Sequence, residues 1–166
     1  MNDAIRDLLS YERRPREVRI ICPIVTDPEI CDGNTFLKII KRLSQVEDII
    51  ISLITCKPIA RSRASEFVKK EVKKRLDVIQ ALEDMKIRVF QWPSTDLHAK
   101  IILTQSKDDK LALVTSANIT PTALNRNIEV GICFKNERDD IYDAIYKYIT
   151  ELLKRIISKQ EELRLN

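Results

Sequence analysis

The stretch Ile49–Thr55, IIISLIT, is almost continuously apolar and rich in β-branched residues. Such a run is typical of a strand that is buried on both faces, in a sheet covered by helices. Val18–Val25, VRIICPIV, has the same character earlier in the chain, and Ile87–Phe90 is a third short apolar run. These three segments are therefore expected to be strands of one sheet.

Helical patterns separate the three expected strands. Asn34 is a candidate N-cap for a helix over Phe36–Val46. A second helix is expected over Glu66–Met85, where apolar residues recur at helical spacing. They are Val68, Val72, Leu76, Ile79 and Leu82. The resulting order β-α-β-α-β predicts a mostly parallel sheet with helices packed on it.

The second half of the chain changes to a pattern of successive strands. Leu97–Leu103 and Lys110–Thr115 are expected to form a hairpin around the polar turn QSKDDK, and Ile128–Phe134 is a further strand. Pro121 is expected to open a short helical turn. A long helix is expected over Arg138–Leu163, with its apolar face packed on the core.

Together these patterns predict a single α/β domain over residues 1–166. Its mixed, mostly parallel β-sheet is expected to be flanked by helices on both faces. No apolar run reaches the roughly 18 residues that span a bilayer, and the charged N-terminus, Met1–Arg19, lacks the apolar stretch of a secretory signal. We therefore expect a cytoplasmic protein that does not contact a membrane. The net charge of +4 mildly favours a polyanionic partner, although a soluble surface explains it equally well.

The four cysteines do not indicate a metal site. Cys22, Cys31, Cys56 and Cys133 form no CxxC pair, and the chain has only one histidine. Cys22, Cys56 and Cys133 each lie in an apolar, strand-like run, so we expect buried free thiols at these positions.

The residues that carry chemistry lie between His98 and Glu129. Strand side chains alternate, so His98 and Lys100 are expected to point the same way, and Ser116 and Asn118 are expected to do the same at the end of the next strand. If the strands are neighbours, the imidazole, a fixed cation, two neutral donors and a carboxylate converge on one spot. Histidine suits acid, base or nucleophile chemistry near neutral pH, and the lysine and the asparagine amide suit the oxygens of a phosphate.

The motifs His98-Ala99-Lys100, Ser116-Ala117-Asn118 and Asn127-Ile128-Glu129-Val130-Gly131 resemble the signature of the phospholipase D superfamily. The signature occurs once, as in the small single-motif endonucleases of that superfamily. Two positions depart from it. Gln105 stands where the family has an aspartate, and Thr115 stands where it has a glycine before the serine.

The resemblance implies a metal-independent phosphodiesterase without a cofactor, active as a homodimer that pairs two copies of His98. One imidazole would attack phosphorus to form a phosphohistidine, while the other would act as acid and then as base. Lys100, Ser116 and Asn118 would hold the phosphoryl oxygens, and Glu129 would orient His98.

Substrate choice is less constrained by the sequence. Lys57, Arg61 and Arg63 follow a predicted parallel strand and are expected to bind a nucleic-acid backbone, although a solvated connector is an equal alternative. The main hypothesis is an endonuclease acting on DNA or RNA. The alternatives are a phospholipase or phosphatidyltransferase acting on lipid phosphodiesters, and a non-catalytic dimer that binds nucleic acid with the same fold.

Overall fold

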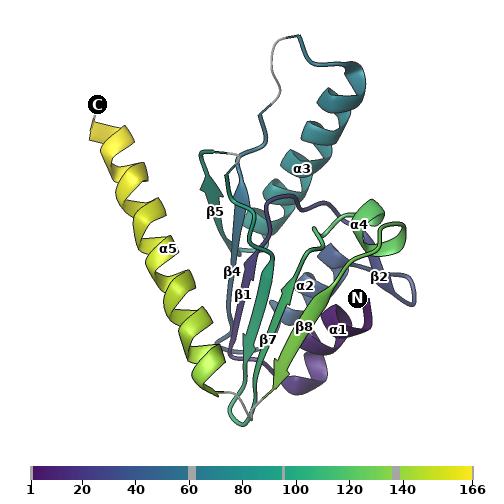
Figure 1. Ribbon diagram of the computed structural model, residues 1–166, viewed down its shortest axis with the longest axis vertical. Helices are drawn as coiled ribbons and strands as arrows, with labels where there is room; N and C mark the ends of the chain where they lie inside the picture. Colours follow the sequence, from purple (N-terminus) through teal and green to yellow (C-terminus); the bar gives the residue numbers. More distant parts are fainter. Residues whose placement is uncertain (1, 60–62, 95, 136–138, 166) are drawn as a thin grey trace.

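A six-stranded mixed sheet forms the centre of the computed structural model, which describes residues 2–59, 63–94, 96–135 and 139–165 (Figure 1). The strand order is β5-β4-β1-β6-β7-β8. The strands are β1 (Glu17–Ile21), β4 (Ile50–Cys56), β5 (Arg88–Trp92), β6 (Ile101–Gln105), β7 (Lys110–Thr115) and β8 (Gly131–Lys135). Each expected strand is therefore present, with shifts at its ends.

The directions of the strands agree with the expected fold class. β1, β4 and β5 are parallel, as the β-α-β-α-β pattern predicts. β6 pairs antiparallel with both β1 and β7, and β8 pairs antiparallel with β7. Since β7 therefore runs in the same direction as β1, four of the six strands point one way. The hairpin predicted around QSKDDK is the β6–β7 turn, in which Gln105 pairs with Lys110.

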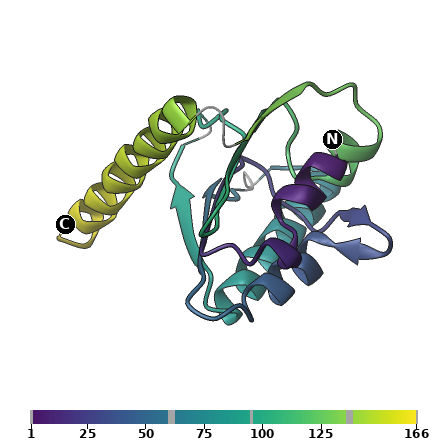
Figure 2. The ribbon, with the colours of Figure 1, turned by 90° about the horizontal axis from the view of Figure 1, so that it is seen from below.

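Helices cover both faces of the sheet, as expected. The helices are α1 (Asn2–Leu8), α2 (Phe36–Leu43), α3 (Glu66–Asp84), α4 (Pro121–Asn125) and α5 (Asp139–Leu165), with a 3₁₀ turn, η1, at Tyr11–Arg13. Figures 1 and 2 show α1, α2 and α3 on one side of the sheet and α5 on the other. A small separate hairpin, β2 (Glu29–Cys31) with β3 (Asn34–Thr35), precedes α2 and was not predicted.

Alternating strand side chains divide the core into two layers. Val18, Ile20 and Leu53 pack with residues of α1 and α2, whereas Ile21 and Ile54 pack with residues of α5. This alternation follows from the two-residue period of a strand, and both layers are apolar because both faces are covered. The apolar face of α5 is core packing, as expected, with Ile149 and Ile156 buried.

Two local predictions, the N-cap of α2 and the burial of Cys133, differ from the structure. The N-cap of α2 is Thr35, whose Oγ1 accepts from the N–H of Lys38 at 3.5 Å, and not Asn34. Cys133 is exposed because it lies on the edge strand β8 and faces away from α5, against which its neighbour Phe134 packs, whereas Cys22 and Cys56 are buried free thiols as expected.

The first half of α3 does not pack on the sheet. Figure 1 shows this half of the helix extending past the strands. Phe67 is 73% exposed, and the expected packing residues Val68 and Leu76 are also exposed, so burial on this helix starts only at Val78. The helical period predicted the helix correctly but not how far the sheet beneath it extends.

Candidate active site

The motif residues lie at one end of the strands, which is called the catalytic edge of the sheet below. β1, β4 and β7 end there, whereas β6 and β8 begin there, because these two strands run in the opposite direction. Ile21 pairs with Ile101, and Thr115 pairs with Gly131. The residues just before Ile101 and Gly131 are therefore neighbours of the residues just after Thr115.

His98 and Lys100 lie in an irregular segment that leads into β6, and not on a strand as predicted. β6 begins at Ile101, and the side chain of Leu97 is buried on the α5 side. Lys100 Nζ donates a hydrogen bond to the backbone oxygen of His98 at 2.9 Å, and the oxygen of Lys100 accepts from Thr115 N at 3.0 Å. The His98 side chain is exposed and forms no hydrogen bond with any residue that the structure describes. Its ring is thus open to a ligand.

Ser116 and Glu129 form a hydrogen-bonded pair across the β7–β8 edge. Ser116 Oγ donates to Glu129 Oε2 and accepts from the N–H of Val130 at 3.0 Å. Asn127 Nδ2 donates to Glu129 Oε1 at 3.2 Å. The carboxylate of Glu129 is therefore held by Ser116 and Asn127, and within the described residues it has no hydrogen bond or ion pair with His98.

Asn118 is held next to a buried thiol. Its side-chain oxygen lies 3.7 Å from the sulfur of Cys22, and that sulfur accepts from the N–H of Ile119 at 3.2 Å. Burial raises the pKa of the Cys22 thiol to about 11, and the nearby charges of Lys100 and Arg75 oppose this shift. Cys22 is therefore a neutral thiol near neutral pH, and it supports the position of Asn118 from beneath.

A cavity of about 290 Å³ opens at this edge and brings four of the expected site residues together. His98, Lys100, Asn118 and Lys57 all line it. Ser116 and Glu129 do not line it, although Ser116 is only two residues from Asn118 in the chain. The cavity thus combines an unpaired imidazole, two amines and an amide, which is a set of groups suited to an anionic phosphodiester.

Arg75 is a lining residue that the sequence did not reveal. Its Nη2 donates to the backbone oxygens of Pro23 at 3.0 Å and Cys56 at 2.8 Å, so it joins the segments that follow β1 and end β4. Burial lowers the pKa of Arg75 from its ordinary value, and the guanidinium still remains charged at neutral pH. In the sequence, Arg75 is one of many basic residues on a predicted helix. Its role is visible only from its contacts with Pro23 and Cys56, which are distant in the chain.

The basic loop residues are not gathered at the cavity. Lys57 lines it, whereas Arg63 is exposed near the start of α3 and is not among the lining residues. Arg61 lies outside the residues that the structure describes. Trp92 is half-buried against the α5-side core, and its ring nitrogen donates to Asp96 Oδ1 at 2.6 Å. Trp92 is therefore a packing residue in this structure.

The two departures from the family signature have different structural settings. Gln105 lies at the opposite end of β6 from His98 and accepts a hydrogen bond there from Arg16 N at 2.7 Å. Thr115 Oγ1 donates to Val130 O at 3.1 Å and accepts from Ala117 N at 3.0 Å. Gln105 is thus remote from the cavity, and the threonine hydroxyl is used in shaping the turn.

The described residues contain neither a metal-binding cluster nor a membrane-spanning helix. None of these residues form a group of three or more histidine, cysteine, aspartate or glutamate side chains that could hold a metal ion. Within the same part of the chain, no helix is both long and apolar enough to cross a bilayer.

Comparison with known proteins identifies the family. Residues 1–156 match the family model described as cardiolipin synthase, PLD-like domain. No curated protein is similar enough in sequence to match the chain. Several solved structures are similar in fold. Nuc from Salmonella typhimurium, a phospholipase D family member, has a TM-score of 0.58 at 14% identity and covers 89% of this chain and 84% of its own.

Two further structures with the same fold differ greatly from each other in length. NucT from Helicobacter pylori has a TM-score of 0.57 at 18% identity, covering 90% of this chain and 87% of its own. Polyphosphate kinase from Porphyromonas gingivalis has a TM-score of 0.57 at 16% identity, covering 92% of this chain but 22% of its own. Because all three identities lie between 14% and 18%, the structural similarity establishes that this chain shares their fold and no more.

Proposed function

This chain belongs to the phospholipase D superfamily, and from that premise we propose that it is a metal-independent endonuclease that cleaves phosphodiester bonds in DNA or RNA. The observation that carries the proposal is that His98, Lys100 and Asn118 line one cavity. Family membership supports phosphodiester chemistry in general, and the similar fold of Nuc supports nucleic acid as the substrate.

The reaction proceeds in two displacements at phosphorus. A ring nitrogen of His98 attacks phosphorus, and the leaving oxygen departs with a proton from a second His98, which gives a phosphohistidine. The second imidazole, now neutral, takes a proton from water as that water attacks phosphorus and releases the first imidazole. Lys100 and Asn118 stabilise the charge on the phosphoryl oxygens throughout.

This scheme requires two copies of the chain, because the sequence contains one histidine. Exposed apolar side chains at the catalytic edge support such a homodimer. Ile128 is 100% exposed and Ile132 is 60% exposed, and both lie in or next to the edge strand β8. Burial of these side chains against a second copy, related by a two-fold axis, would place a second site nearby.

A role for Lys57 in substrate binding also follows from its place on the cavity wall. Arg63 extends the positive charge toward α3, and Arg61 belongs to the same basic loop. Ser116 and Glu129 act together in this scheme, since the carboxylate accepts from the serine hydroxyl. Their role is to hold the β7–β8 edge in position, and through it the turn that carries Asn118.

The test is cleavage of a DNA or RNA substrate in a gel, with EDTA present. Wild-type protein is expected to cleave with and without the chelator, and His98→Ala is expected to lose activity by more than about 10³-fold. Lys41→Ala, on the exposed face of α2, is the matched control and should cleave normally. Cleavage that stops in EDTA would contradict the metal-independent mechanism. Binding of nucleic acid without any cleavage would favour the non-catalytic dimer.

Lipid phosphodiesters are a second candidate substrate, favoured by apolar residues beside the cavity. Ile59 is 61% exposed and Ile24 is also exposed, and both line the cavity that holds His98. The matching family model carries the name of cardiolipin synthase. Release of the headgroup or exchange of the phosphatidyl group on phospholipid vesicles distinguishes this activity from nucleic-acid cleavage. His98→Ala should abolish either activity.

A further inference from the structure

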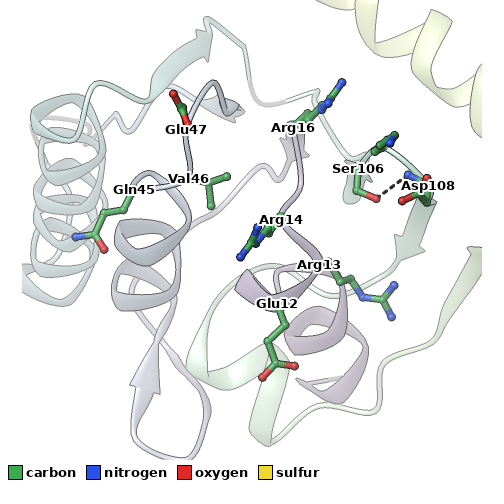
Figure 3. Close-up of a pocket in the computed structure, with 10 residues that line it drawn as sticks. Glu12, Arg13, Arg14, Arg16, Gln45, Val46, Glu47, Ser106 and Asp108 are labelled. Atoms are coloured by element: carbon green, nitrogen blue, oxygen red, sulfur yellow. Dashed lines mark hydrogen bonds between the residues drawn. The ribbon is translucent and has the colours of Figure 1, made fainter.

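A second cavity lies at the opposite end of the sheet from the catalytic one. It measures about 540 Å³ and lies between the η1 turn, the segment after α2 and the β6–β7 turn (Figure 3). Arg16 and Cys22 precede and follow β1, so the two cavities are separated by roughly 20 Å along that strand. A ligand in one cavity does not reach the other.

Two arginines that have no ion pair within the described residues line this second cavity. Arg14 and Arg16 both line it, and neither forms an ion pair or a side-chain hydrogen bond with any residue in the described part of the chain. Lys107 adds a further cation from the β6–β7 turn. By contrast, Arg13, which also lines the cavity, is neutralised by Asp109 at 3.3 Å. Two guanidinium groups on a concave surface attract phosphate oxygens.

The backbone that carries these arginines is held in place. Pro15, between them, is buried. Arg16 N donates to Gln105 O at 2.7 Å, and Arg16 O accepts from Ile50 N at 2.8 Å, so the two neighbouring strands fix its main chain. Figure 3 shows Arg14 near the middle of the hollow, between the labelled Glu12 and Arg16. The arginines are thus presented on a rigid support and not on a freely moving loop.

Acidic side chains limit the kind of anion that fits. Glu12, Glu47 and Asp108 line the same cavity, and in the described part of the chain none of them pairs with Arg14 or Arg16. A continuous nucleic-acid backbone would bring phosphates close to these carboxylates and would be repelled. A small ligand with one charged end would avoid this repulsion, because its hydroxyl or amino groups could donate to the carboxylates. The volume is also within the usual range for small-molecule sites.

We propose that this cavity is a second ligand site, which binds a small phosphorylated compound of the nucleotide class through Arg14 and Arg16. The phosphates lie against the two guanidinium groups, and the sugar hydroxyls or base amino groups face Glu12 and Glu47. This site is independent of the proposed nuclease activity, because it shares no residue with the catalytic cavity.

The test uses the wild-type chain and ADP in the presence of EDTA, followed by NMR of backbone amides and arginine Nε–H groups. The signals of Arg14 and Arg16 are expected to shift and saturate, and the affinity is measured by calorimetry. The double variant Arg14→Gln/Arg16→Gln should bind at least tenfold more weakly. Lys41→Gln/Lys69→Gln removes the same charge elsewhere and should bind as wild type does. Matched urea midpoints check that each variant is folded.

Pyrophosphate and adenosine serve as partial ligands in the same titration. Pyrophosphate is expected to shift the arginine signals at higher concentration, whereas adenosine alone binds much more weakly. The proposal is overturned if ADP shifts only signals around Lys100 and Asn118. It is equally overturned if both double variants lose affinity alike, or if adenosine binds as well as ADP.

Discussion

The guanidinium carbon of Arg19 lies 3.8 Å from the centroid of the Tyr146 ring, so a charged group of β1 is stacked on the inner side of α5. The same guanidinium donates to Tyr146 Oη at 2.5 Å, to Thr150 Oγ1 at 2.8 Å and to Glu17 Oε1 at 2.7 Å. Arg19 is only 12% exposed at its side chain. This cluster fixes α5 on the sheet by directional contacts, in addition to apolar packing.

Arg19→Met is therefore expected to lower the free energy of unfolding by about 2 to 4 kcal/mol, since it removes a cation and leaves Glu17 partly buried without its partner. Urea unfolding monitored by circular dichroism measures this loss. Arg88→Met, at an exposed position on β5, is the control and should change stability by less than about 0.5 kcal/mol. Equal stabilities of the two variants would show that the cluster adds nothing.

Cys22→Ala tests the link between the buried thiol and Asn118. The variant loses a buried sulfur atom and the acceptor for Ile119 N, so we expect about 1 to 3 kcal/mol of destabilisation. It should also lower the rate of phosphodiester cleavage, because Asn118 loses its support. Ile40→Val, in the α2 layer, gives a comparable truncation away from the site. Cleavage by that control should be unchanged, and an equal effect of both variants would contradict the link.

The pH dependence of stability follows from the shifted pKa of Cys22. Burial raises this pKa from 9.0 to about 11 in the folded chain. The unfolded chain therefore loses the proton first, and the stability that the neutral thiol contributes is fully present below about pH 9. It is lost as the pH rises from about 9 to about 11, and the loss amounts to about 2 to 3 kcal/mol.

Urea unfolding at about pH 8 and about pH 11 measures this contribution when wild type is compared with Cys22→Ala. Other groups titrate alike in both proteins, so the wild type should lose the larger amount of stability. Parallel losses in the two proteins would mean that the thiol ionises in the folded state as easily as in the unfolded state.

Arg75→Met removes the connection between the segment after β1 and the end of β4. Two backbone oxygens, of Pro23 and Cys56, lose their charged donor, and we expect a destabilisation of about 2 to 4 kcal/mol. The KM for an oligonucleotide should rise, because both segments form walls of the catalytic cavity. Arg75→Lys keeps the charge and should recover part of the affinity. A variant with normal KM and normal stability would exclude this role.

Ile132→Asp tests the proposed homodimer. A carboxylate in the middle of an apolar contact is costly to bury, so this variant should sediment as a monomer and lose nuclease activity together with dimerisation. Phe67→Asp introduces the same charge at an exposed position on α3, which lies on the far side of the sheet from β8. That control should remain a dimer. An active monomeric variant would show that one copy suffices.

Much of the fold could be predicted because the apolar pattern of each central strand in the sequence agrees with its burial in the structure. Ile50–Cys56 is apolar on both faces in the sequence and is covered on both faces in the structure. Local pattern failed where burial depends on a distant element. The period of α3 could not show that its buried residues begin only at Val78, and the apolar run around Cys133 could not show that one face of β8 is left uncovered.

The candidate site was predictable to a similar degree. The motif order placed His98, Lys100 and Asn118 together because their strands are neighbours in the sheet. The predicted strand position of His98 was wrong, since the chain reaches β6 only at Ile101. Cys22 and Arg75 could not be found from the sequence, because each acts through a backbone group or side chain that is remote in the chain.

The open edge of β8 has a consequence for handling the protein. An uncovered edge strand offers its free backbone groups as a template for cross-chain pairing, and a charged gatekeeper usually blocks this. On β8 only Lys135 carries a charge. Preparations that expose this edge, including monomeric variants, are therefore expected to aggregate as they are concentrated or warmed. Cys133→Lys, at an exposed position on β8, would be the first change for improving solubility.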